Sequence, residues 1–131
     1  MTVAVDQVDL PDMLAELTAV FEQYERALVG NDIATLNRLF RDADATVRYG
    51  YGENLYGHAA ISAFRARRSP AGLARAVVRR SLHTFGRDFA VTNIEFVRDG
   101  ETRIGRQSQT WVRLAEGWRI VCAHVSWMDA P

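Results

Sequence analysis

Two short turns in the second half of the chain constrain the fold more than any other feature. The dipeptides Asp99-Gly100 and Glu116-Gly117 separate long stretches that read as β-strands. An acidic residue followed by glycine suits the tight two-residue turn of a β-hairpin. Together with a turn at 86–88, they predict four consecutive antiparallel strands, at about 75–85, 88–98, 102–114 and 118–127.

The first half of the chain has mainly helical spacing. Apolar side chains recur three and four residues apart along one predicted helix face, which consists of Leu14, Leu17, Phe21, Tyr24 and Leu28. This helix begins within residues 9–12, where Pro11 suits a first turn, and Gly30-Asn31 stops it. The other elements expected in this half are a helix at 32–40, strands at 45–50 and 53–56, and a helix at 58–67.

Helices segregated from a mainly antiparallel sheet define the α+β class. We therefore predict three helices packed on one strongly curved, mainly antiparallel sheet of six strands. The 131 residues suit one such domain. The domain is expected to span 9–131, after a flexible lead-in at 1–8.

Composition excludes several classes of function. The formal net charge is zero, so no overall basic field attracts nucleic acid or a membrane surface. The single cysteine, Cys122, rules out an internal disulfide, and the three histidines lack metal-site spacing, so we expect no metal and no cofactor. Without a signal peptide or an apolar span, a cytoplasmic protein is expected. The arginine-rich run at 65–80 is interpreted as a solvated surface, with anion binding as the alternative.

The hairpin turns also predict which side chains share a face, because strand register fixes the faces. A turn at Glu116-Gly117 places one set of side chains together, namely Gln107, Gln109, Trp111, Arg113, Ile120, Cys122, His124 and Ser126. If Asp99-Gly100 is also a two-residue turn, Ile94 opposes Gly105, and Thr92, Ile94 and Phe96 continue this face. The opposite face then carries apolar side chains that include Val112, Val121, Val125 and Trp127. The helices cannot cover both faces, so this second surface predicts a homodimer.

Several segments resemble a known superfamily. The helix pair, "LYGHAAISAF" at 55–64 and "GWRIVCAHVS" at 117–126 resemble the nuclear transport factor two-like superfamily, the cone-shaped fold shared with ketosteroid isomerases. The segments "YERALVGND" (24–32), "TVRYGYGENLYGHAAI" (46–61), "GRDFA" (86–90) and "RIGRQSQTWVR" (103–113) are similar to a narrower bacterial family. That family includes the small amidohydrolase of cyanuric acid breakdown, which converts 1,3-dicarboxyurea to allophanate. The resemblance implies that the face with Gln109 and His124 lines the cone.

The same resemblance implies two catalytic residues, Tyr24 and Arg48. From the residues alone, a core tyrosine is the favoured interpretation of Tyr24. For Arg48, an exposed strand arginine is as good an interpretation as one inside the cone. A phenol is a proton donor at neutral pH, so Tyr24 is expected to be a general acid or a hydrogen-bond donor. An arginine inside the cone, with no acidic residue on the polar face, would bind a carboxylate in a bidentate fork.

A polar set on neighbouring strands is the expected substrate-binding patch, and it comprises Gln107, Gln109, His124 and Ser126. These side chains offer donors and acceptors that suit a small urea-like molecule, although a satisfied core network is the alternative. His58 is expected to begin a helix, and Cys122 to fill core space on the inner face.

The expected function is removal of a terminal carboxyl group, with loss of carbon dioxide, from an N-carboxylated urea. The expected partners are a small carboxylate substrate, a second copy of the chain and an associated amidase, with neither nucleic acid nor membrane. One alternative is a non-catalytic ligand-binding or accessory subunit of an amidase. Another is a ketosteroid isomerase-like isomerase or lyase, which needs an acidic base in the cone.

Overall fold

The computed structural model describes residues 2–131 and confirms the α+β fold, with three helices and a six-stranded sheet. A 3-10 turn at Val5–Gln7 precedes the helices, which are α1 (Pro11–Val29), α2 (Ile33–Leu39) and α3 (His58–Arg67). The strands are β1 (Val47–Tyr49), β2 (Asn54–Tyr56), β3 (Ala76–Phe85), β4 (Phe89–Val97), β5 (Ile104–Leu114) and β6 (Gly117–Met128). Every helix and strand predicted from the sequence is therefore present.

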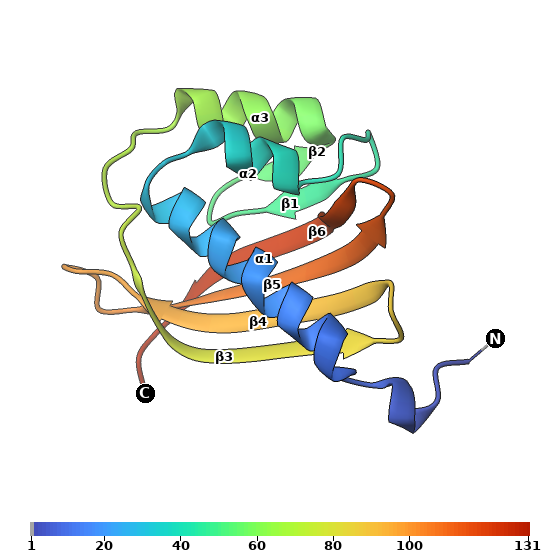
Figure 1. Cartoon of the computed structure of the whole chain (residues 1–131). Helices are drawn as coiled ribbons and strands as arrows, with labels where there is room; N and C mark the ends of the chain where they lie inside the picture. Colours follow the sequence, from blue (N-terminus) through green and yellow to red (C-terminus); the bar gives the residue numbers. More distant parts are fainter. Residues whose placement is uncertain (1) are drawn as a thin grey trace.

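The strands are arranged in the order β2-β1-β6-β5-β4-β3. Neighbours pair antiparallel, except that β1 and β6 run parallel, so the sheet is mixed but mainly antiparallel. Figure 1 shows α1 crossing one face of the curved sheet, with α2 and α3 near the end formed by β1 and β2. We call the face beneath the helices the inner face and the opposite one the outer face.

Local signals explain the helix ends. Pro11 occupies the first turn of α1, where its missing N–H has no partner to lose. After Gly30, Asn31 has a φ of 51°, a left-handed conformation that stops the helix. Asp32 then caps α2, because its carboxylate accepts hydrogen bonds from the Thr35 amide at 3.2 Å and hydroxyl at 2.6 Å.

The segment before α1 differs from the flexible lead-in expected at 1–8, of which Met1 lies outside the described residues. Val8 forms an antiparallel bridge with Phe85 at the end of β3. The amide of Gly86 donates a hydrogen bond to the carbonyl of Gln7 at 2.9 Å. These backbone bonds attach the segment to the β3–β4 turn.

The β4–β5 hairpin has a longer connection than predicted, yet its faces are correct. Asp99-Gly100 lies within the connection at 98–103, and Phe96 pairs with Gly105. This register differs from the predicted one by two residues. Since an even shift returns each side chain to the same face, Ile94 and Phe96 are buried on the inner face as predicted.

The β5–β6 hairpin departs from the prediction in two ways. Leu114 pairs with Gly117, so the turn residues are Ala115-Glu116 rather than Glu116-Gly117, and a β-bulge follows on β6. Trp111 pairs with Ile120, but its neighbour Thr110 pairs with Cys122, which leaves Val121 as an extra residue on β6. A bulge of one residue reverses the face of every side chain beyond it. The predicted faces are therefore correct between the turn and the bulge and reversed from Cys122 onward.

This reversal corrects part of the predicted inner face. Three side chains expected inside lie on the outer face, namely Cys122, His124 and Ser126. Ala123 and Val125 are buried inside instead. Trp127 also lies on the inner side, with its ring 5.5 Å from that of Phe96. Val125 and Trp127 therefore do not contribute to an outer apolar surface, and Cys122 is exposed rather than a core filler.

The core lies between the helices and the inner face. Trp111 of β5 is fully buried, and its indole N–H donates to the hydroxyl of Thr92 at 3.0 Å. Leu17 of α1 and Leu36 of α2 are buried in the same cluster. Helices and sheet both contribute to this cluster. A second, smaller cluster consists of Phe21, Ile94, Phe96 and Val125, of which Val125 lines the cavity described below.

Gly105 provides a stability test of the β4–β5 register. Its paired residue Phe96 is fully buried, and a Cβ at Gly105 would collide with the Phe96 ring. We expect Gly105→Ala to lower the free energy of unfolding by about 1–3 kcal/mol, because the packed ring has no free space to enter. Gly52→Ala is the matched control, since a Cβ there meets nothing within 4 Å. Urea unfolding followed by tryptophan fluorescence measures both, and equal midpoints would contradict this register.

Candidate functional site

A cavity of about 180 Å³ lies between α1, the β1–β2 hairpin, the end of α3 and the inner face of the sheet. Its lining is formed by Tyr24, Leu28, Arg48, Tyr51, Glu53, Phe64, Arg68, Leu73, Arg75, Arg98, Gln107 and Val125. The volume is below the usual range for drug-sized ligands, so the cavity suits a small metabolite. Arginine is the most frequent residue in this lining.

Tyr24 reaches the cavity from α1, on the same buried helix face as Phe21 and Leu28. Its side chain is 3% exposed, and its ring lies 6.3 Å from that of Phe40. Burial lowers the pKa of Arg65 to about 10, and Tyr24 beside it offsets part of that shift. The phenol therefore lies near guanidinium groups, which can stabilise negative charge that develops in the cavity.

Arg48 lines the cavity from β1, so it points inward rather than to water. Its side chain is 12% exposed, and its guanidinium lies 5.5 Å from the centre of the Phe64 ring. The expectation that it has no acidic partner is wrong, since Nη1 donates to Oε1 of Glu53 at 3.1 Å. Glu53 was missed because it lies on the turn between β1 and β2 rather than on a strand of the inner face.

The glycines of this turn allow Glu53 to reach back to Arg48. A Cβ at Gly50 would collide with the Glu53 carboxylate, so only glycine leaves it room. The amide of Gly52 donates to the second carboxylate oxygen at 3.1 Å. The Gly-rich turn is the sequence signal that could have placed Glu53 beside Arg48.

Arg75 is the second paired arginine of the cavity. It forms a bidentate pair with Glu25 of α1, at 2.6 and 3.2 Å, and also donates to Gln107 at 3.1 Å. Its side chain is only 2% exposed, and its guanidinium stacks 4.3 Å from the centre of the Phe96 ring. These contacts fix Arg75 and hold the amide of Gln107 at the cavity wall.

Arg68 and Arg98 differ from the other two arginines. Within residues 2–131, Nε and Nη2 of Arg68 and Nε of Arg98 are buried without a hydrogen-bond partner. Burial lowers the pKa of Arg68, and the positive charges of Arg48, Arg98 and Arg75 lower it further, against an opposing effect of Tyr24. The four arginines are thus close enough to repel one another, and an anion in the cavity would relieve that repulsion.

The run at 65–80 is therefore not uniformly a solvated surface. The exposed arginines of this run, as predicted, are Arg67, Arg79 and Arg80. By contrast, Arg65 is buried, and Arg68 and Arg75 both line the cavity. Helical spacing could have identified two of these, because Arg65 and Arg68 follow Ile61 by four and seven residues and so share its buried side. Arg98 is the last residue of the strand predicted at 88–98, and in the structure it directly follows β4. Alternation from Ile94 and Phe96 could have placed it on the inner face.

The predicted substrate-binding patch is divided by the sheet. Gln107 lines the cavity, and Gln109 is buried on the same face, where its side-chain oxygen lies 3.4 Å from the Thr92 hydroxyl. His124 and Ser126 lie on the outer face, where the His124 ring packs edge-on against Tyr49 at 5.7 Å. The structure thus brings Tyr24, Arg48 and Gln107 to one cavity and separates His124 and Ser126 from it.

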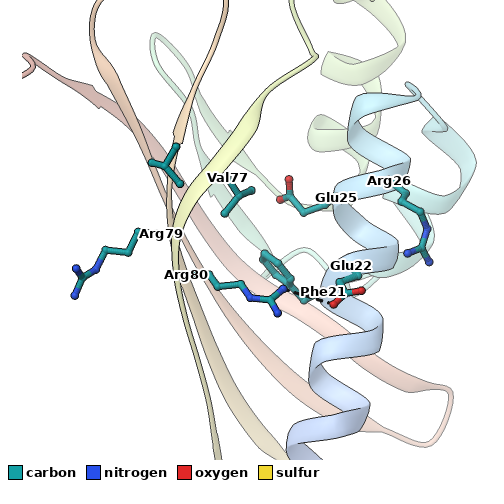
Figure 2. A pocket seen from close by; sticks show the side chains of 8 residues that line it. Phe21, Glu22, Glu25, Arg26, Val77, Arg79 and Arg80 are labelled. Atoms are coloured by element: carbon teal, nitrogen blue, oxygen red, sulfur yellow. Dashed lines mark ion pairs between the residues drawn. The ribbon is translucent and has the colours of Figure 1, made fainter.

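A second hollow lies on the surface between α1 and β3. Figure 2 shows Phe21, Glu22 and Glu25 of α1 facing Val77 and Arg80 of β3, with Arg79 on the other side of the strand. Arg80 pairs with Glu22 at 3.5 Å across this open groove. We place the candidate site in the inner cavity instead, where guanidinium nitrogens of Arg68 and Arg98 are buried without acceptors among the described residues.

Residues 2–131 contain no cluster of three or more His, Cys, Asp or Glu side chains that could hold a metal ion. His58 begins α3 as expected, and its Nε2 lies 2.7 Å from the carbonyl of Asn37, while His83 pairs with Asp9 at 2.8 Å. Among the same residues, no helix is long and apolar enough to cross a membrane.

The curved sheet, the helices on its inner face and the enclosed cavity define a cone of the nuclear transport factor two-like type. The model of the AtzH-like family matches residues 6–131, so the chain belongs to that family. No curated protein matches the sequence.

Several solved structures share this fold. A protein of unknown function from the DUF3225 family of Pectobacterium atrosepticum is 54% identical, with a TM-score of 0.95 over 97% of this chain and 99% of that one. A cystatin-like fold protein from Burkholderia xenovorans is 48% identical, with a TM-score of 0.91 over 95% and 98%. A putative ketosteroid isomerase from Parabacteroides distasonis is 12% identical, with a TM-score of 0.68 over 83% and 85%, and shares the fold alone.

Proposed function

We propose that this protein is a small amidohydrolase that removes a terminal carboxyl group from an N-carboxylated urea such as 1,3-dicarboxyurea. The product would be allophanate, in the catabolism of nitrogen compounds. The observation that carries the proposal is the position of Tyr24 in a small cavity lined by four arginines, Arg48, Arg68, Arg75 and Arg98. Membership of the AtzH-like family supports the link to cyanuric acid breakdown.

The reaction requires two contributions from the protein, a proton donor and a group that holds a carboxylate of the substrate. The bond between the urea nitrogen and the terminal carboxyl carbon breaks, and its electron pair remains on nitrogen. That carbon leaves as carbon dioxide, and the nitrogen takes a proton to become an amide. Tyr24 donates this proton as the general acid and regains one from water. Arg48 holds a carboxylate of the substrate, for which it exchanges its hydrogen bond to Glu53.

The alternative function, an isomerase or lyase, needs an acidic base in the cavity, and Glu53 is the residue to consider for that role. An acidic residue does line the cavity, although none was expected there from the sequence. Its oxygens, however, already accept hydrogen bonds from Arg48 and from the Gly52 amide, which leaves it poorly placed to remove a proton. The positive cavity favours decarboxylation of an acid over proton abstraction from a neutral steroid-like ligand.

Release of carbon dioxide from 1,3-dicarboxyurea tests the proposal. This acid also loses carbon dioxide unaided, so the rate with protein is compared with the rate without it. We expect a rate that exceeds the spontaneous one and rises in proportion to protein concentration. A rate equal to the spontaneous one would favour the accessory-subunit alternative, which predicts co-purification with an amidase instead.

We still propose a homodimer through the outer face, but the surface that forms it no longer includes Val125 and Trp127, which lie on the inner side. The helices leave the outer face uncovered, and the rings of Tyr49 and Tyr56 form an exposed aromatic pair there, at 6.3 Å. Val112 and Val121 extend the surface. We expect light scattering at micromolar concentration to give the mass of a dimer, and Tyr56→Arg to shift it toward the monomer. A wild-type monomer would contradict this proposal.

A further inference from the structure

Two half-buried arginines that line the cavity have buried guanidinium nitrogens with no acceptor within the described residues. The unpartnered atoms are Nε and Nη2 of Arg68 and Nε of Arg98. Buried donors without partners are rare in proteins because each one loses its hydrogen bonds to water on folding. Two such groups in one cavity therefore indicate a ligand that supplies acceptors.

The other two arginines do not need that ligand in the same way. Arg48 has Glu53 as its partner at 3.1 Å, and Arg75 has Glu25 at 2.6 Å. Four lining arginines minus these two carboxylates leave a formal charge of +2, which belongs to Arg68 and Arg98. A ligand with one negative charge would neutralise only half of it.

The guanidinium of Arg98 lies among three aromatic rings. Its guanidinium lies 5.6 Å from the centre of the Tyr51 ring, 5.7 Å from Phe96 and 5.4 Å from Trp127. Tyr51 and Trp127 also stack on each other at 4.7 Å. Stacking orients a guanidinium without satisfying its N–H donors, so Arg98 is positioned in advance to bind an anion.

Arg68 is placed by the end of α3. It is the residue that follows the last helical position, and its amide donates to the Phe64 carbonyl at 3.0 Å. This backbone contact anchors the base of the side chain while the guanidinium lines the cavity. Arg68 and Arg98 thus approach the cavity from different elements, one from a helix end and one from the end of β4.

We propose that Arg68 and Arg98 form a second carboxylate-binding subsite, distinct from Arg48, so that the cavity selects short dicarboxylates over monocarboxylates. This inference rests on the proposed function in that it takes the cavity as the substrate site. The subsite also explains turnover, because loss of one carboxyl group as carbon dioxide leaves a product with one negative charge. That product binds more weakly than the substrate and leaves the cavity.

Calorimetry with glutarate and pentanoate tests the subsite without any turnover. Both have the same five-carbon chain, but pentanoate has a methyl group in place of the second carboxylate. We expect glutarate to bind the wild-type protein about tenfold or more tightly than pentanoate, at constant ionic strength. Arg98→Gln and Arg68→Gln should each remove most of this preference, because glutarate loses more affinity than pentanoate does.

Two further variants complete the experiment. Arg79→Gln is the control, because that side chain is 79% exposed on the outer side of β3 and should keep the preference. Arg98→Lys replaces Arg98→Gln as the test if Arg98→Gln does not fold, because it keeps the positive charge. It should lose part of the glutarate preference, since a lysine cannot form the bidentate hydrogen bonds of a guanidinium. Equal affinity of the wild type for the two acids, no binding of either, or an unchanged preference in the Arg68 and Arg98 variants would overturn the subsite.

The outcomes also separate the subsite from the proposed reaction. A glutarate preference without release of carbon dioxide from 1,3-dicarboxyurea would support the subsite and overturn the amidohydrolase. Release of carbon dioxide without a glutarate preference would support the amidohydrolase and overturn the subsite.

Discussion

Replacement of Tyr24 by phenylalanine should lower the turnover of 1,3-dicarboxyurea by about 100-fold or more, because it removes the proposed general acid. The change keeps the ring, which packs against Phe40 and is 3% exposed, so the core volume is retained. The cost to the free energy of unfolding should be about 1 kcal/mol at most, the value of one hydrogen bond. Carbon dioxide release and urea unfolding measure the two effects separately.

Tyr49→Phe is the matched control for this variant. Tyr49 is 37% exposed on the outer face, beside His124, and does not line the cavity. Tyr49→Phe removes the same phenol hydroxyl as Tyr24→Phe does, but we expect it to leave the turnover of 1,3-dicarboxyurea unchanged. Wild-type turnover in a folded Tyr24→Phe protein would show that the phenol is not the acid.

Arg48→Lys should weaken substrate binding by about tenfold or more, although the net charge stays the same. A lysine cannot form the two parallel hydrogen bonds that a guanidinium makes to a carboxylate. It also loses the stacking of Arg48 on the Phe64 ring at 5.5 Å. The expected signature is a higher KM with a smaller change in kcat, since Arg48 holds substrate in both the ground and transition states.

Arg79→Lys is the control for that measurement, since Arg79 is exposed on the far side of β3. Unfolding should report an intact protein for both arginine variants, because neither change removes apolar core volume. An unchanged KM in Arg48→Lys would mean that the substrate carboxylate is held elsewhere in the cavity.

The elements of the fold were predictable because their signals are local. The apolar stripe of α1 and the capping residue Asp32 depend only on neighbours in sequence. The β4–β5 register was two residues away from the prediction, yet the buried position of Phe96 was correct because an even shift preserves faces.

The faces of β6 could not be predicted in the same way. Val121 is the extra residue of a bulge, and a valine in a strand carries no mark that distinguishes it from its paired neighbours. This single residue moved His124 and Ser126 from the predicted site to the outer face. Counting from a turn is thus reliable only up to the first irregularity of the strand pair.

The charge balance of the cavity was not predicted from the sequence. Glu53 and Arg98 are end residues of the strands predicted at 53–56 and 88–98, and in the structure both lie just outside the regular strands. Alternation from Ile94 and Phe96 could have placed Arg98 on the inner face, whereas no pattern paired Glu53 with Arg48. Tyr24 and Arg48 were identified through a family resemblance, and the structure shows both lining the same cavity. The acceptors that the remaining arginines lack became visible only when the side chains were placed in three dimensions.

The central claim, that this cavity decarboxylates an N-carboxylated urea, is tested most directly by following ¹³C-labelled 1,3-dicarboxyurea by NMR. The wild-type protein should convert its carboxyl signals to those of allophanate and carbon dioxide faster than the spontaneous reaction. A variant with both Tyr24→Phe and Arg48→Lys should leave the conversion at the spontaneous rate. Equal conversion by the wild-type protein and the double variant would contradict the account.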